Sequence, residues 1–419
     1  DDIIMDKSYL ITQCSVFKKL DGDSSSEFGL LAGNPNISYY ESLFSPSVNV
    51  TIETTDVSGF VSREEIYGGQ SIEISIKMFD PDIDDFKIKK DKHGLVVNSV
   101  KNVTMDFKES KSTLECVSKD FLRNEVARLN RRFTGNVTEI VKKIMEEEPK
   151  GIKTTKDIEV DQATNSYTFC GNLKRSIDTI QWLQPKAKSE NQFGFLFFED
   201  YDGYKFKSIE SLLKQEPFTD QPFEMSQAST SSRFAILDAV MVQTNDVFLN
   251  MRSGTYNNDT TYIDLISQTK SVDDFKIDNL KDLKNPPKLP DNLTDSTSRK
   301  MLRFDDPGVM QKGSKRENEQ PKEELAKIQN QSYARNNLLF SQALKIKVSF
   351  NPSLRVGKII EVRLPVDTDS SESGVKYQKL GKGDLSGKYL ISELRHKVGS
   401  NKSSTHLTLV RDLFTKDNA

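Results

Sequence analysis

Two stretches of this chain repeat each other in order and in spacing. Residues 69–74 read GQSIEI and resemble residues 357–362, which read GKIIEV. Residues 114–120 resemble residues 407–412 in the same way. The glycine that opens the first match and the leucine that opens the second are 45 residues apart in one copy (Gly69 and Leu114) and 50 in the other (Gly357 and Leu407). Two matches in one order predict a duplicated β unit. Three chains of this kind would supply six similar units to one ring.

Apolar and polar residues alternate in both regions that contain the repeat. In the first copy, Ile72, Ile74 and Ile76 are separated by Glu73 and Ser75. A period of two with one apolar face predicts half-buried strands. Strands are expected over residues 48–53, 72–78, 95–107, 113–117, 344–350, 360–364, 389–394 and 406–413. Several short strands joined by turns predict a small barrel or sandwich in the first region.

Between these regions the apolar period becomes that of helices. Leu122, Val126, Leu129 and Phe133 are spaced by four, three and four residues, which predicts one helical stripe. Two further helices are expected to begin near residues 136 and 172. Asp202-Gly203 between two aromatic-rich runs predicts a hairpin, and Pro-rich, charged residues 268–320 predict a long surface excursion before a helix near 323–340.

These patterns predict an α+β chain, mainly β, with two related small β-barrel domains and inserted α+β modules. Residues 1–118 are expected to form the first barrel and residues 119–222 the first insert module. Residues 223–250 and 341–415 are expected to form a discontinuous second barrel. Residues 251–340 are then an insertion that holds a helix and the polar, partly mobile excursion.

Charge and cysteine content exclude several classes of function. The chain has 59 Lys+Arg against 62 Asp+Glu, which argues against a protein that grips nucleic acid. Cys14, Cys116 and Cys170 show no metal-ligand spacing and fit reduced thiols made in a cytoplasm. No apolar run approaches the roughly 20 residues that span a bilayer. The first residues lack a signal-peptide pattern, so we expect delivery by assembly rather than secretion.

Two loop motifs invite a ligand but depart from the pattern that the ligand needs. Asp80, Asp82 and Asp84 fit positions one, three and five of a calcium loop, but Asp85 stands where glycine is needed and Asp91 where glutamate is needed. Glycine-rich residues 381–388 have one residue too few for a phosphate loop. A solvated acidic turn and an inter-strand loop are the favoured interpretations.

Three sets of polar residues are candidates for chemical sites. Carboxylates at a turn could form a glycosidase pair, although turn carboxylates more often face water: Glu199, Asp200 and Asp202. Histidines without a metal or nucleophile pattern are His93, His396 and His406. A basic helix face could contact DNA or a partner, although a solvated face paired with Glu125 is favoured: Arg123, Arg128, Arg131 and Arg132. We therefore expect no catalytic residue, no metal and no cofactor.

Several segments carry a family resemblance. Residues 386–397, SGKYLISELRHK, and 405–412, THLTLVRD, resemble the closing strands of phage tail-hub proteins. Residues 135–141 and 198–206 resemble the middle of T-even-type baseplate hubs, and residues 247–256 resemble the segment that leaves the second barrel there. The matches appear in the right order over most of the chain. The chain thus resembles the baseplate central hub family of contractile-tailed phages.

The resemblance implies a virion protein of the tail baseplate, assembled in the host cytoplasm. It implies a homotrimer whose two barrels per chain form a pseudo-sixfold ring, with a channel for DNA in transit. The implied partners are other copies of the chain, a spike or tail-lysozyme-type protein, tail tube or tube-initiator proteins, baseplate wedge proteins and the tape-measure protein. The structural motif of the ring barrels is expected at Gly69, Ile72, Ile74, Leu114, Asp120, Gly357, Ile360, Val362, Tyr389, Leu407 and Asp412.

Two alternative functions stay open at this point. One is the equivalent hub of a bacterial contractile secretion apparatus, which the same physics would serve. The other is a carbohydrate-active enzyme or an adhesin, for which Glu199 and Asp202 would be the test positions.

Overall fold

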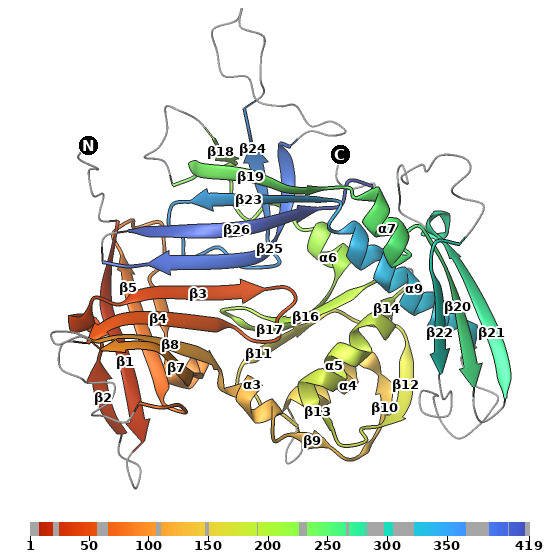
Figure 1. Ribbon diagram of the computed structural model, residues 1–419, viewed down its shortest axis with the longest axis horizontal. Helices are drawn as coiled ribbons and strands as arrows, with labels where there is room; N and C mark the ends of the chain where they lie inside the picture. The colour runs from red at the N-terminus through yellow and green to blue at the C-terminus, as the bar shows by residue number, and fades with distance from the viewer. Residues whose placement is uncertain are drawn as a thin grey trace, which may run out of the picture.

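Alternation of apolar and polar residues builds one large sheet from the N-terminal and C-terminal regions of this chain. The computed structural model describes residues 8–19, 25–56, 66–105, 110–146, 151–190, 192–225, 233–264, 268–280, 283, 297–304, 322–365, 385–400 and 402–414. Within them a 14-stranded sheet runs through the molecule, and smaller sheets and helices lie to one side of it (Figure 1). The predicted fold class, mainly β with α+β insertions, is confirmed.

The first unit of the sheet comes from the N-terminal region. Its strands are β1 (Tyr9–Lys19), β2 (Ser25–Gly29), β3 (Asn36–Ser42), β4 (Asn49–Asp56), β5 (Ser71–Met78), β6 (Phe86–Ile88), β7 (Leu95–Met105) and β8 (Ser110–Ser118). A one-turn 3-10 helix, Leu31–Gly33, and the short helix α2 (Lys90–His93) connect them. The strands are antiparallel in the order β3-β4-β8-β7-β5-β1-β2.

The second unit contains the strands of the C-terminal region. These are β18 (Phe223–Glu224), β19 (Ile236–Thr244), β23 (Gln342–Val348), β24 (Ile359–Arg363), β25 (Gly387–Val398) and β26 (Ser403–Arg411). They follow the order β19-β23-β26-β25, with β24 also paired to β25. Because β25 pairs with β3 as well, the two units share one sheet and one apolar core. The strand pairings of the described residues therefore join the units rather than closing each as a separate barrel.

The first insertion follows the first unit and has its own apolar core. Its helices are α3 (Lys119–Asn124), α4 (Val137–Glu146), α5 (Ser176–Leu183) and α6 (Ile209–Leu213), with a 3-10 turn at Gln184–Lys186. Its strands are β9 (Arg128–Leu129), β10 (Arg132–Asn136), β11 (Asp157–Val160), β12 (Ser166–Cys170), β13 (Lys174–Arg175), β14 (Lys188–Ser189), β15 (Gln192–Phe193), β16 (Phe195–Glu199) and β17 (Gly203–Ser208). The hairpin predicted at Asp202-Gly203 is confirmed as β16–β17.

The predicted helix over residues 122–133 is wrong. The helix ends at Asn124, and Val126 is 79% exposed instead of lying on an inward stripe. Residues 132–136 pair with β12, and Phe133 stacks on Phe169 with ring centroids 5.3 Å apart. This cross-strand aromatic contact outweighs the helical spacing of the apolar residues. The helix predicted to begin near residue 136 is confirmed as α4, which begins at Val137, whereas the helix predicted near residue 172 begins at Ser176.

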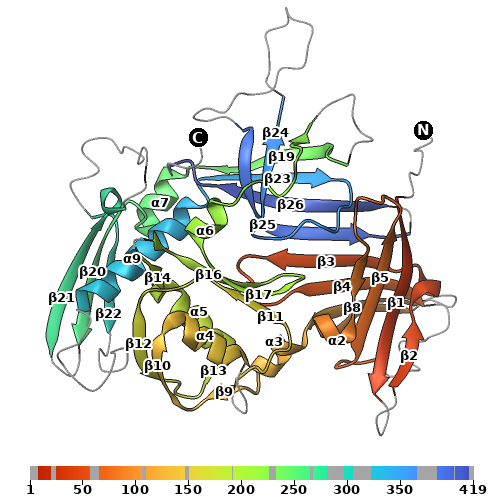
Figure 2. The same ribbon diagram turned by 180° about the vertical axis from the view of Figure 1, so that it is seen from behind.

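The second insertion interrupts the hairpin between β19 and β23. It contains α7 (Val247–Ser253), β20 (Asn257–Asp264), β21 (Thr269–Lys276), a 3-10 turn at Ile277–Asn279, β22 (Lys300–Phe304) and α9 (Lys322–Leu338). Strands β21, β20 and β22 form a three-stranded sheet beside α9, at the far end of the molecule from β1 and β2 (Figure 2). Two strands therefore lie within the segment predicted as a polar excursion. Among the described helices, none has the length and apolar character to cross a membrane.

Candidate functional site

The repeat seen in the sequence is also a repeat of strand order. The first unit has the order β3-β4-β8-β7-β5, and the second has β19-β23-β26-β25-β24. Each strand has one counterpart in the same place, and all of these neighbours are antiparallel. The sheet therefore contains two blocks of four strands, each with a fifth strand at its side.

The two repeat glycines make the same contact. Gly69 donates its N–H to the carbonyl of Val97 at 2.7 Å, and Gly357 donates to the carbonyl of Ile391 at 2.9 Å. The amides of Val97 and Ile391 each return a hydrogen bond to the residue after the glycine. Both glycines have a positive φ, 84° and 78°, which a side chain would strain. A glycine is thus required where β5 and β24 begin.

Both units also carry a β-bulge at the same position. The register of β7 on β8 shifts between Val97 and Ser99, and that of β25 on β26 shifts between Ile391 and Glu393. In each case the shift comes directly after the residue that the repeat glycine contacts. Matching strand order, hydrogen bonds and bulges show that the two units are structural repeats.

The residues predicted as the structural motif lie within the repeats. Seven of them are at most 1% exposed: Ile72, Ile74, Leu114, Ile360, Val362, Tyr389 and Leu407. Asp120 accepts a hydrogen bond from the hydroxyl of Thr154 at 2.6 Å. Asp412 pairs with Arg335 of α9 at 2.9 Å. Asp412 thereby connects the end of β26 to the second insertion, whereas Asp120 lies on α3 and forms its contact within the first insertion.

The two repeats differ at their edges. β3 is covered by the second half of β25, with Ser42 to Ile37 opposite Glu393 to Val398. β19 is the counterpart of β3 and β7 is the counterpart of β25. In the described part of the chain, the outer edge of β19 and the second half of β7 have no such strand partner.

Exposure follows this difference. Ser38 and Tyr39 of β3 are 7% and 2% exposed, whereas their counterparts Val240 and Met241 of β19 are 53% and 36% exposed. Leu237 and Val242 on the same strand are also exposed. Exposed apolar side chains on a long edge strand are a template for pairing with another strand. The sequence shows only an apolar run here, because nothing local marks a strand as an edge.

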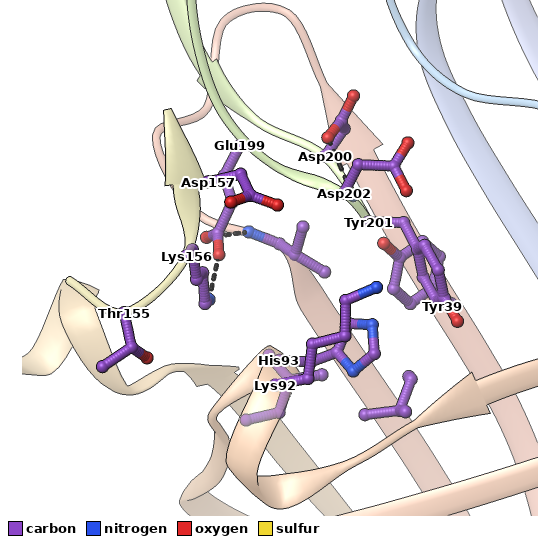
Figure 3. Close-up of a pocket in the computed structure, with 13 residues that line it drawn as sticks. Tyr39, Lys92, His93, Thr155, Lys156, Asp157, Glu199, Asp200, Tyr201 and Asp202 are labelled. Atoms are coloured by element: carbon purple, nitrogen blue, oxygen red, sulfur yellow. Dashed lines mark hydrogen bonds and ion pairs between the residues drawn. The ribbon is translucent and has the colours of Figure 1, made fainter. Parts of the chain in front are cut away.

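The carboxylates considered as a glycosidase pair line a small cavity between the first unit and the first insertion. Figure 3 shows Glu199 and Lys156 pointing toward each other, and they form a buried ion pair. Glu199 also accepts the N–H of Val48 at 3.0 Å. The cavity is about 50 Å³, far below the roughly 300–1,000 Å³ of ordinary ligand pockets. Burial raises the pKa of Glu199, while Lys156 opposes that rise.

The expectation that the turn carboxylates face water is wrong for two of the three. Glu199 and Asp200 are buried, and Asp200 lies 3.3 Å from the ammonium of Lys205. Only Asp202 is largely exposed. Because Glu199 and Asp200 are buried, their carboxylates hold the hairpin against neighbouring segments and are not open to a substrate.

Glu41 on β3 joins three parts of the chain and was not found from the sequence. Its carboxylate accepts hydrogen bonds from the Tyr39 hydroxyl at 2.8 Å, the Tyr201 N–H at 2.9 Å and the Val356 N–H at 3.0 Å. These partners belong to the first unit, the first insertion and the second unit. Burial raises the pKa of Glu41 to about 7, and nearby Arg355 opposes the rise. A lone glutamate in a strand has no local signal for such a role.

Glu41→Gln is expected to flatten the pH dependence of stability. The folded carboxyl has a pKa of about 7 against an ordinary value of 4.5, so folding takes up a proton between these values. The contribution of this carboxyl to the free energy of unfolding is complete below pH 4.5 and is lost as the pH rises through about 7. Urea denaturation at several pH values between 5 and 8 measures this loss. The exposed Glu53→Gln is the control, and equal slopes for Glu41→Gln and wild type would contradict the assignment.

Of the remaining candidates, Asp82 of the acidic turn is 72% exposed, as expected for a solvated turn, whereas His396 is buried. The Arg233 guanidinium lies 3.3 Å from Asp82 and 3.9 Å from Asp80. His396 and His406 are on adjacent strands, but His396 is opposite Thr405 and not opposite His406. Its Nδ1 lies 2.9 Å from the Thr405 hydroxyl, and burial lowers its pKa well below the usual value.

The basic residues do not share one helix face. Arg128 lies on β9 and Arg132 on β10, while Arg123 is on α3. Glu125, the expected partner of this face, forms its ion pair with Arg175 at 2.7 Å. Glycine-rich residues 381–384 lie outside the described residues.

Neither a protein-family model nor a curated protein matches the sequence. Solved structures do match. A tail protein from Neisseria meningitidis MC58 is similar at a TM-score of 0.54 and 12% identity, over 98% of this chain and 99% of that one. The 43 kDa tail protein of prophage MuSo2 from Shewanella oneidensis is similar at a TM-score of 0.53 and 10% identity, over 96% and 99%.

These two similarities extend over nearly the whole of each chain, so they include both repeats and both insertions. At 12% and 10% identity they define the fold alone. The chain therefore has the fold of these two tail proteins, and the resemblance predicted from its sequence is confirmed as a tail-protein fold.

Proposed function

We propose that this chain is a structural, non-enzymatic hub of a contractile phage tail. Three copies form a ring that joins the sixfold tail tube on one face to a threefold, cell-piercing spike on the other. The observation that carries this proposal is the structural repeat: each chain supplies two units with the same strand order, glycine contact and bulge. A ring of three such chains presents six similar positions and keeps threefold symmetry.

A polar face of the sheet supports the proposed channel. A groove there is lined by basic residues of β23 and β25, namely Lys345, Lys347 and Arg395, and by the acidic residues Asp238 and Glu393. A face with charges of both signs is well hydrated, as the wall of a water-filled channel would be. These charges give no run of positive charge that would hold DNA phosphates, so DNA would pass without being retained.

In the proposed assembly the chain contacts further tail components. They are the tail tube or its initiator, the spike or tail-lysozyme-type protein, the baseplate wedge and the tape-measure protein. The protein would be made in the host cytoplasm and reside in the virion tail baseplate. The fold shared with phage tail proteins supports this location.

The mass of the purified chain in solution tests the proposal. We expect three times the mass of one chain at micromolar concentration, measured by sedimentation or light scattering. Electron-microscope images along the symmetry axis should show a central channel with near-sixfold features on one face. A monomer at that concentration, or a closed dimer, would contradict the ring.

A further inference from the structure

We infer that β19 of one chain pairs antiparallel with β7 of the next chain, repeating between chains the contact that β3 and β25 make within a chain. This inference rests on the proposed function, because it names the surfaces that would join the ring. It starts from the two free edges described above. β19 is the counterpart of the covered strand β3, and β7 is the counterpart of its partner β25.

The internal contact fixes the register of the proposed one. Ser38 of β3 pairs with Lys397 of β25. Leu114 and Leu407 are the leucines that occupy the same place in the two repeats. Across the one strand that lies between, Ser38 is aligned with the residue that follows Leu114, and Val240 is aligned with the residue that follows Leu407. Val240 is therefore the counterpart of Ser38.

The counterpart of Lys397 on the first unit is Thr104. Lys397 is opposite Ser404, and Thr104 is opposite Lys111. Ser404 and Lys111 each stand three residues before the repeat leucine of their strand. Val240 of one chain should therefore lie opposite Thr104 of its neighbour.

The side-chain faces agree with this register. Val240 lines the polar groove together with Lys345 and Thr408. Thr104 is exposed and pairs with Lys111, two positions along β8 from Thr113. Directly opposite residues of antiparallel strands point to one face of a sheet. Both side chains would thus lie on the polar face of the joined sheet.

Met241 then points to the opposite, apolar face. Its counterpart Tyr39 is buried there and packs edge-on against Phe86, with ring centroids 5.1 Å apart. Covering Met241 with a neighbouring chain would remove apolar surface from water, which stabilises association by about 25 cal/mol per Å². Backbone hydrogen bonds along the strand pair would add direction and register.

A second copy of this chain is the occupant that fits both edges. Every chain carries one β19 edge and one β7 edge, so each contact uses one of each and the sheet continues without interruption from chain to chain. Once such a head-to-tail contact closes into a ring, neither the β19 edge nor the β7 edge remains free. Ring closure also covers the exposed apolar edge strand β19, which would otherwise be a template for pairing with other proteins.

Cysteine pairs test the register directly. In a Cys170→Ser background, which removes the exposed native cysteine while Cys14 and Cys116 stay buried, we combine Val240→Cys with Thr104→Cys. Mild oxidation should give covalent dimers and trimers on a non-reducing gel. Mixing the two single variants should give only a covalent dimer, and neither single variant alone should cross-link.

A matched control uses the internal counterpart. Ser38→Cys with Lys397→Cys should form a bond within one chain, which shows that this strand geometry permits a disulfide. Pairing Val240→Cys with Lys77→Cys of β5, away from the proposed contact, should give no cross-link.

The outcomes separate this inference from the proposed function. A trimer by mass that does not cross-link through Val240 and Thr104, while the internal control does, would overturn the strand pairing and leave the trimer standing. A monomer would overturn the proposed function. Cross-linked species longer than a trimer would support the pairing and contradict closure at three chains.

Discussion

Arg335→Met is expected to lower the free energy of unfolding by about 3–5 kcal/mol. Arg335 on α9 is buried, and its guanidinium pairs with Asp412 at 2.9 Å and with Glu210 of α6. Methionine fills similar space but removes the guanidinium that pairs with both buried carboxylates. Because the three residues belong to the second insertion, the second unit and the first insertion, the loss should affect the whole fold. Urea denaturation followed by circular dichroism measures it.

A neutralised triad is the control for this prediction. Arg335→Met combined with Glu210→Gln and Asp412→Asn removes all three charges, and we expect it to recover most of the lost stability. Arg128→Met, on the exposed side of β9, should change stability by less than about 0.5 kcal/mol. A cost below about 1 kcal/mol for Arg335→Met would show that the triad contributes little.

Met241→Lys is expected to dissociate the oligomer while leaving each chain folded. Met241 is partly exposed in one chain, so a lysine there can reach water. In the proposed ring the same position lies in the apolar layer against the next chain, where an unpaired ammonium costs several kcal/mol. That cost corresponds to at least about a 100-fold loss of affinity. Sedimentation at micromolar concentration should therefore show monomers, with an unchanged circular dichroism spectrum.

Val272→Lys is the matched control for the edge-strand variant. Val272 is an exposed apolar residue on β21, away from both proposed edges. The same charge at this position should leave the oligomer intact. A Met241→Lys chain that remains trimeric would show that the ring is joined by another surface.

Local patterns in the sequence predicted the elements better than their partners. Alternation along residues 72–78 and the Asp202-Gly203 turn identified strands, because each strand buries one face and each tight turn needs special residues. The helix expected over residues 122–133 failed because Phe133 finds a partner in Phe169, 36 residues later. No window of sequence contains both sides of that contact.

In the candidate site, too, the sequence did not predict contacts between segments that are far apart in the chain. The repeat was visible because its glycines and leucines recur, and each glycine has a backbone conformation that requires it. The pairing of β3 with β25 joins the two ends of the chain. The edges of β19 and β7 that no described strand covers therefore appear only once the sheet is assembled. Glu41 and Arg335 are charged residues whose sequence neighbours give no sign of burial. Their roles depend on partners supplied by three separate segments.

The bulges that recur in β7 and β25 also determine how the sheet bends. A bulge increases the local twist of a strand and turns it away from a flat course. One such turn comes at the same residue of each block of four strands, directly after Val97 in β7 and directly after Ile391 in β25. The two blocks therefore share a bend at the same place. A sheet that continued from chain to chain would meet this bend again in every block.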